Sequence, residues 1–211
     1  MVAFMAATPA VADQPLAWLA PACGAPCQAV RAQLTPADAA ELTALPGQVA
    51  HTLSLSERAM LPLDNQAELV LRRIAQGKND GNFDRVRPGK HLCTVYWFGF
   101  LENGSEKVGT HSCRIVRKNG VITVGKSTGD GFSATLLPYD GSLRAVVGRT
   151  FLPEQKERTY DRDKPANTGN ENYGNKVGLA IADKGRLYLI SINERGFSDP
   201  DTSFFEVLAI D

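Results

Sequence analysis

The feature that most constrains the fold is a succession of strand-like runs that occupies the chain from residue 88 onward. The runs are rich in β-branched and aromatic residues and are separated by turn pairs that contain Gly, as strands joined by tight turns are. They lie near residues 91–101, 107–117, 121–126, 131–137, 143–151, 176–182, 186–193 and 203–210. Since no strand–helix–strand alternation occurs, a doubly wound fold is excluded. The pattern predicts a mainly β protein with about eight antiparallel strands, arranged as an up-and-down barrel or a strongly curved sheet.

Residues 35–77 show helical patterns instead. Thr35 can cap a helix, and Pro46 followed by Gly predicts its end. A second helix is predicted over residues 65–76, where apolar residues recur at helical spacing. The first strand is apolar on both faces and therefore needs a cover, for which this second helix is the expected element. We expect one α+β domain over residues 35–211, with a helical part at 35–77 and a β part at 88–211.

The N-terminal residues 1–12 are small, apolar and uncharged, and they end in Ala-Val-Ala. Such an A-x-A pattern is what signal peptidases cleave, but the basic segment that opens a signal peptide is missing. Two interpretations stay open: an exported protein whose true start lies upstream, or a cytosolic protein with a chance match. Export is favoured and predicts a periplasmic or secreted protein, with residues 13–34 as a linker that contains the C-x3-C pair.

The four cysteines also favour an oxidising compartment. Cys23 and Cys27 have a spacing that fits neither a C-x-x-C redox motif nor a zinc site. The even number of cysteines, with Cys93 and Cys113 as the second pair, predicts two disulfides. Buried free thiols are the alternative.

The pairing of the second two cysteines follows from a predicted strand register. A three-residue hairpin loop at 102–104, with Gly in the left-handed position, would set Leu101 opposite Ser105. Counting outward then brings Cys93 opposite Cys113, within reach of a disulfide. A slip of one residue would send the two sulfurs to opposite faces of the sheet.

Motif searches yield no catalytic signature. Residues 120–127 fit the P-loop pattern G-x-x-x-x-G-K-[ST], but the middle residues prefer a strand and a turn follows them, so no nucleotide site is predicted. His91 and His111 share a predicted face without forming a direct pair, and no acidic third ligand accompanies them, so no metal site is predicted. No cofactor is expected, although a catalytic triad assembled in space stays possible.

Charge and hydropathy narrow the range of partners. The 23 Lys and Arg residues balance the 23 Asp and Glu residues, so nothing global attracts the chain to nucleic acid or to an anionic membrane. No apolar run approaches the roughly 18–20 residues that cross a bilayer. The expected partners are therefore a small apolar ligand or an envelope protein, and the oligomeric state is left open.

The aromatic residues near the first hairpin form the most unusual local cluster: Tyr96, Trp97, Phe98 and Phe100. Alternation along the strands places Trp97 and His111 on the same face, toward the expected barrel interior. Both are therefore candidate contacts for a ligand. Alternatively, Trp97 fills the core of a packed barrel, because the interior of eight strands is only just wide enough for side chains.

Several segments resemble an uncharacterised family of small exported bacterial proteins that share a domain of unknown function. The segments are Leu34-Thr35-Pro36-Ala37-Asp38, Pro88-Gly89-Lys90-His91-Leu92-Cys93, His111-Ser112-Cys113-Arg114-Ile115, Lys126-Ser127-Thr128-Gly129 and Phe204-Phe205-Glu206-Val207-Leu208. After Gly129 the chain departs from the family, which continues there with a polar Gln-Arg pair. The resemblance implies export and the two-cysteine hairpin, and it supplies no activity.

These observations favour an exported, non-enzymatic β protein that binds a small apolar molecule in the barrel or a protein partner. Two alternatives remain. One is an envelope hydrolase with the charged segment 153–175 as its lid, although a long polar segment of this kind is also typical of disorder. The other is a protein inhibitor of an envelope enzyme.

Overall fold

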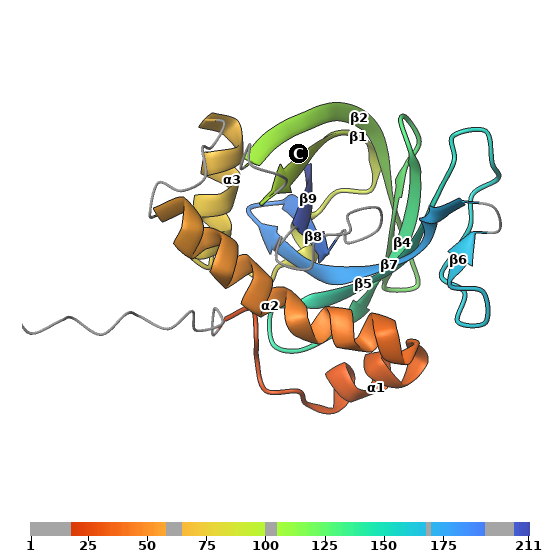
Figure 1. Cartoon of the computed structure of the whole chain (residues 1–211), viewed down its shortest axis with the longest axis horizontal. Helices are drawn as coiled ribbons and strands as arrows, with labels where there is room; N and C mark the ends of the chain where they lie inside the picture. The colour runs from red at the N-terminus through yellow and green to blue at the C-terminus, as the bar shows by residue number, and fades with distance from the viewer. Residues whose placement is uncertain (1–17, 58–64, 100–104, 168–169, 193–204) are drawn as a thin grey trace, which may run out of the picture.

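The computed structural model describes residues 18–57, 65–99, 105–167, 170–192 and 205–211, and its centre is a closed antiparallel barrel (Figure 1). The predicted β fold is confirmed, because eight strands run β1-β2-β3-β4-β5-β7-β8-β9, with β5 paired to β7 and β9 paired back to β1. Their bounds are β1 Gly89–Phe98, β2 Ser105–Lys118, β3 Val121–Lys126, β4 Gly131–Pro138, β5 Arg144–Phe151, β7 Asn170–Asp183, β8 Arg186–Ile192 and β9 Phe205–Ile210. A two-residue strand, β6 Ala166–Asn167, pairs with the start of β7.

Three helices and one 3₁₀ turn accompany the barrel: α1 Ala25–Gln33, α2 Pro36–Glu57, α3 Asn65–Ala75 and η1 Phe83–Arg85. The predicted helix 65–76 is confirmed as α3, which packs on β1 and β2. Two expectations are wrong. The linker 13–34 contains α1, whose Pro26 in the first turn was a helix-start signal, and α2 continues through Pro46 to Glu57.

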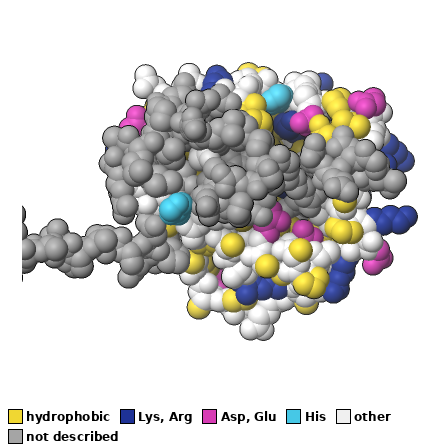
Figure 2. Space-filling model, in the orientation of Figure 1, with side chains coloured by type: hydrophobic (Ala, Val, Ile, Leu, Met, Phe, Trp, Pro, Cys, Tyr) yellow, Lys and Arg dark blue, Asp and Glu magenta, His cyan; other side chains and the backbone are white. Residues whose placement is uncertain are grey.

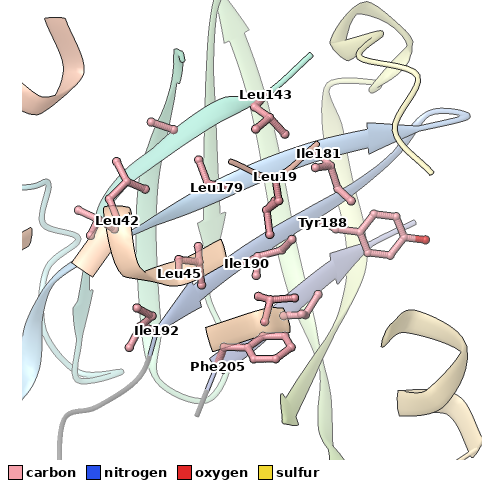
Figure 3. Packing of buried hydrophobic residues seen from close by; sticks show 14 of the residues in the cluster. Leu19, Leu42, Leu45, Leu143, Leu179, Ile181, Tyr188, Ile190, Ile192 and Phe205 are labelled. Atoms are coloured by element: carbon pink, nitrogen blue, oxygen red, sulfur yellow. The ribbon is translucent and has the colours of Figure 1, made fainter. Parts of the chain in front are cut away.

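The continuation of α2 beyond Pro46 has a packing cause. An internal proline costs a helix about 3 kcal/mol, but Leu42, Leu45 and Val49 are almost completely buried on the side of α2 that faces the barrel. Figure 3 shows Leu42 and Leu45 over side chains of β7 and β8, among them Leu179 and Ile190. Burial of several such side chains, each contributing roughly 1.5–3 kcal/mol, outweighs the cost of one proline.

Strict alternation divides the barrel strands between an outer and an inner core. On β1, Tyr96 and Phe98 face the helices, whereas Val95 and Trp97 belong to the interior cluster. The inner cluster is separate from the outer one, which the helices complete. The strand that the sequence marks as apolar on both faces is therefore buried on both faces, as predicted.

The hairpin of β1 and β2 corrects the predicted register. Phe98 pairs with Ser105, so the expected pairing of Leu101 with Ser105 is wrong, and Cys93 lies opposite His111. The loop 102–104 and Phe100 lie outside the described residues. A bulge follows, because Tyr96 pairs with Lys107 while the preceding Val95 pairs with Gly109.

Both predicted disulfides are nevertheless present. Cys93 and Cys113 are diagonal neighbours with Cα atoms 5.8 Å apart, and Cys23 and Cys27 bridge the start of α1 with Cα atoms 5.2 Å apart. The predicted register differs from the observed one by two residues at Cys93. Because side chains alternate between the faces of a strand, a shift by an even number leaves each side chain on its predicted face, and Cys93 and Cys113 still share one. In the observed register His91 pairs with Cys113 and His111 pairs with Cys93, so the two histidines are not a direct pair.

The charged segment after β5 is ordered within its described part, so the expectation of disorder is wrong there. Tyr160 donates a hydrogen bond of 2.6 Å to the buried carboxylate of Asp38 on α2. Arg149 on β5 donates to the carbonyl of Lys164 at 2.7 Å and to the side chain of Asn175 at 3.1 Å. These bonds tie the segment to the helices and to β7, and residues 170–175 are part of β7 itself.

Charged side chains of both signs are visible on one face of the molecule (Figure 2). Figure 2 shows Lys and Arg side chains interspersed with Asp and Glu side chains on the face that it presents. None of the helices in the described ranges is both long enough and apolar enough to cross a bilayer. The signal-like segment 1–12 lies outside the described residues.

Candidate ligand-binding site

The interior of the barrel is filled at one end and hollow at the other. At the filled end the inward side chains are apolar, and the buried Cys93–Cys113 disulfide lies among them. Phe83 and Val86, from η1 and the residue after it, belong to the same cluster. Arg117 of β2 donates hydrogen bonds to the carbonyls of both residues, so η1 is fixed as a plug over this end.

The other end encloses a cavity of about 530 Å³, within the range of small-molecule sites. All eight barrel strands contribute to its wall. The residues whose side chains define its polar and aromatic ring, called the polar ring below, are Trp97, His111, Lys126, Phe132, Lys176, Ser191 and Glu206. Beneath them lie Val95, Val146, Leu189 and Leu208, called the apolar floor, all of which are buried.

Both site residues that the sequence predicted, Trp97 and His111, line this cavity. They lie on adjacent strands and share the inner face, as the alternation indicated. Trp97 also packs against the inner apolar cluster, so it borders the cavity and contributes to the core at the same time. Whether either residue contacts a ligand stays a prediction.

A buried ion pair crosses the polar ring. Lys176 of β7 donates to Glu206 of β9 at 2.6 Å, and the two side chains are only 12% and 16% exposed. The indole N–H of Trp97 donates to the other carboxylate oxygen of Glu206 at 2.9 Å. Burial raises the pKa of Glu206, but the ammonium of Lys176 and these hydrogen bonds outweigh it and hold the pKa below its ordinary value of 4.5.

Lys126, at the end of β3, is the second ammonium of the ring. It donates to the backbone carbonyls of Thr128 at 3.3 Å and of Asp130, which lie in the turn between β3 and β4. Among the described residues, no carboxylate oxygen lies within 4 Å of it, in contrast to Lys176. Burial lowers the pKa of Lys126, while the charges of Glu206 and Asp130 oppose that change.

His111 is fitted closely against the turn that Lys126 holds. Gly129 has φ +62°, and a Cβ added there would lie 2.8 Å from Cε1 of His111. The hydroxyl of Thr128 accepts a hydrogen bond of 2.9 Å from the backbone N–H of Ser112, which pins the turn to β2. Burial lowers the pKa of His111 from 6.5 and the neighbouring Lys126 lowers it further, so the imidazole is neutral at pH 7.

The outer rim of the cavity carries a second hydrogen bond between side chains. Tyr173 of β7 donates to the carboxylate of Asp130 at 2.7 Å. That hydrogen bond, followed by burial, raises the pKa of Tyr173 to about 12, so its hydroxyl stays neutral and donating. Tyr173 and Asn175 come from the segment expected as a loop, and both line the cavity.

Sequence reasoning missed the charged members of the ring: Lys126, Lys176 and Glu206. Lys126 entered only through the rejected P-loop match and one segment that resembles the exported family, and the other two were not singled out as site residues. A signal existed, since Lys176 and Glu206 each occupy an inward position in a strand whose alternate residues are apolar. A charge at such a position indicates either a partner or a polar cavity.

The structure does not support the nucleotide or metal sites that the motif search considered within residues 120–127 and at the histidines. The P-loop match over residues 120–127 is strand β3 with its flanking residues, as its apolar middle predicted. Within the described ranges, no group of three or more His, Cys, Asp or Glu side chains is arranged to hold a metal ion. The two ring nitrogens of His91 lie 2.8 Å from the main-chain oxygens of Arg87 and Asp211, which indicates a structural role.

Comparison with known proteins identifies no relative: no family model, no curated protein and no solved structure matches the chain.

Proposed function

We propose that this chain is an exported, non-enzymatic binding protein that holds a small molecule in the hollow end of its barrel. The observation that carries the proposal is the cavity of about 530 Å³, which all eight strands line. Barrels of eight strands have an interior that is either filled by side chains or just large enough for one small ligand. This barrel has one end of each kind, and polar side chains such as Lys126, Lys176 and Glu206 line the hollow end.

The two disulfides support the exported location. One of them lies within the barrel core and the other fixes the start of α1. Disulfides form and persist in oxidising compartments, which for a bacterial protein means the periplasm or the exterior. The resemblance to a family of small exported bacterial proteins agrees with this location and adds no function to it.

Binding is favoured over hydrolysis by the way in which the ring is assembled. Nucleophilic catalysis needs a nucleophile within hydrogen-bond reach of a base. In the described part of the chain, the imidazole of His111 has no hydrogen bond with a Ser, Thr or Cys side chain, and Glu206 is held by Lys176 and Trp97. Trp97, Lys176 and Glu206 are fixed to one another, an arrangement that suits recognition of a ligand.

Native mass spectrometry of protein isolated from a bacterial periplasm tests the proposal. The expected result is a mass above that of the chain with two disulfides, with the difference released on denaturation as a small molecule. Trp18→Phe then leaves Trp97 as the only tryptophan, because the chain has two. Trp18 packs against Gly77 at the end of α3, away from the cavity. Re-addition of the released molecule should change Trp97 fluorescence.

Two results would contradict the proposal. One is an empty protein whose Trp97 fluorescence does not respond to a fractionated extract of small molecules. The other is a bound molecule whose affinity is unchanged by Trp97→Phe and by substitution of the apolar floor, for example Leu208→Phe, which reduces the cavity. A protein partner recovered instead would favour the inhibitor alternative.

A further inference from the structure

We propose that the ligand is an amphipathic organic acid whose anionic group binds Lys126 and whose apolar body lies on the floor of the cavity. This inference rests on the proposed function and names the chemical class of the ligand. Three features of the cavity carry it: the spare donor capacity of Lys126, the layering of the wall, and the charge balance of the polar ring.

The first feature is the hydrogen bonding of the two ammonium groups. An ammonium has three N–H donors. Lys126 directs two contacts to the carbonyls of Thr128 and Asp130, and no described carboxylate oxygen lies within 4 Å of it. Lys176, by contrast, already has Glu206 at 2.6 Å. A partly buried ammonium whose partners are only carbonyls can still accept an anion, because an opposite charge offsets the cost of removing it from water.

The second feature is the order of polar and apolar side chains along the barrel axis. The floor residues Val95, Val146, Leu189 and Leu208 come from β1, β5, β8 and β9 and meet beneath the polar ring. An apolar group placed on the floor removes apolar surface from water on both sides. A ligand with one charged end is therefore oriented, with its charge at the level of Lys126.

The third feature is the charge that a ligand would meet. The pair of Lys176 and Glu206 is neutral as a unit, and Asp130 accepts a hydrogen bond from Tyr173 on the rim. A cationic ligand would approach two ammonium groups, with Glu206 and Asp130 already engaged; Glu41 of α2 also lines the cavity, so the preference for an anion rests on the position of Lys126 and not on the net charge of the wall. A neutral ligand would leave Lys126 without a counter-ion. His111 is neutral and lies beside the turn of Lys126, so it can exchange one hydrogen bond with an anionic group without adding charge.

A series of probes with one apolar body and three head groups tests this inference without any substitution at Lys126. Decanoate, decanol and decylamine, and the corresponding 2-naphthyl acid, alcohol and amine, are titrated against the Trp18→Phe protein. Binding is measured by Trp97 fluorescence and by calorimetry. We expect the acid of at least one series to bind about 10- to 100-fold more tightly than its alcohol, the range given by one charge-assisted hydrogen bond. The amine should bind no more tightly than the alcohol.

Substitution of the ammonium then assigns the preference to Lys126. Lys126→Met should reduce the affinity for the acid to that for the alcohol, and Lys126→Arg should retain most of the preference. Lys118→Met is the matched control, because Lys118 is exposed at the far end of β2 and should leave every affinity unchanged. Circular dichroism of each variant without ligand establishes that the barrel is folded.

The outcomes separate the two proposals. If none of the six probes binds and no molecule co-purifies, the proposed function fails. If acids and alcohols bind equally, or if Lys126→Met keeps the preference for the acid, the present inference fails while ligand binding stands. If the acid preference disappears in Lys176→Met and not in Lys126→Met, the anion site lies at the wrong lysine and the assignment is overturned.

Discussion

The ion pair between Lys176 and Glu206 should contribute measurably to stability, although ion pairs at protein surfaces seldom do. Nζ of Lys176 and Oε1 of Glu206 are 2.6 Å apart, and both side chains are nearly buried. With an effective dielectric constant of about 20, their attraction is about 6 kcal/mol, and desolvation of the two charges offsets several kcal/mol of it. Lys176→Met leaves Glu206 buried without its cation, which should cost about 3 kcal/mol of unfolding free energy.

A double-mutant cycle measures this contribution. Glu206→Gln keeps an oxygen that can accept the Trp97 N–H and removes only the charge. Each single variant should lower Tm by about 6–12 °C for a chain of this size. The double variant should be more stable than the sum of the single losses predicts, with a coupling of about 2 kcal/mol, because it leaves no unpaired charge. Unfolding is followed in urea with the disulfides intact.

An exposed pair provides the matched control. Arg72 and Glu68 are 2.6 Å apart on α3, but Arg72 is 67% exposed. Arg72→Met should therefore change stability by less than about 0.5 kcal/mol. If the cycle at Lys176 and Glu206 gave a coupling below about 0.5 kcal/mol, burial would not strengthen this pair and the reasoning would be refuted.

Acidification provides an independent test of the same pair. The folded-state pKa of Glu206 is lowered from its ordinary value of 4.5, so the unfolded chain binds its proton more readily than the folded chain. The contribution of Glu206 to stability is therefore fully present above pH 4.5 and is lost as the pH falls through the folded-state pKa. Glu206→Gln should remove this part of the acid dependence.

Three further predictions follow from single contacts. Cys93→Ser and Cys113→Ser should each cost about 3 kcal/mol, the entropy of a loop of 20 residues, and the double variant should cost no more than either; additive losses in urea would contradict the bond. Gly129→Ala should destabilise the protein more than Gly141→Ala does, because both glycines have positive φ but only a Cβ added at residue 129 meets the imidazole of His111. Equal losses of Tm would argue against that contact. The pKa of Tyr160 is raised to about 12 by burial and by its hydrogen bond to a buried carboxylate, so its stabilising effect should be present below pH 10 and decline up to pH 12, and an ultraviolet titration midpoint near 10 would contradict it.

The strands were predictable because their signals are local. Alternation and the Gly-containing turns located all eight barrel strands, and the same alternation placed Trp97 inside and Tyr96 outside. The bounds of the helices were harder to predict from the sequence. Pro46 is a strong local signal for a helix end, but α2 continues through it because the flanking leucines are buried against the barrel. A local sequence pattern does not contain the free energy that a helix gains by packing on strands more than 100 residues away in the chain.

The polar ring required information that periodicity does not contain. Lys176 and Glu206 are adjacent only because β7, β8 and β9 are neighbours in the closed barrel, and Lys126 joins them from β3. The sequence contains each residue at an inward position but not the order in which the strands close. The hollow itself depends on the difference between the volume enclosed and the volume of the inward side chains, which pairing patterns do not determine.

The bulge in the first hairpin shows how narrowly the site depends on local geometry. From Phe98 paired with Ser105, a regular ladder would set Cys93 opposite residue 110 and would turn His111 and Cys113 to the outer face. Val108 is the extra residue, and it restores the inward direction of both side chains. The buried disulfide is incompatible with such a regular ladder, because the sulfurs of Cys93 and Cys113 must meet in the interior. One bulge therefore sets both the core crosslink and the histidine of the polar ring, which couples the stability of the hairpin to the shape of the cavity.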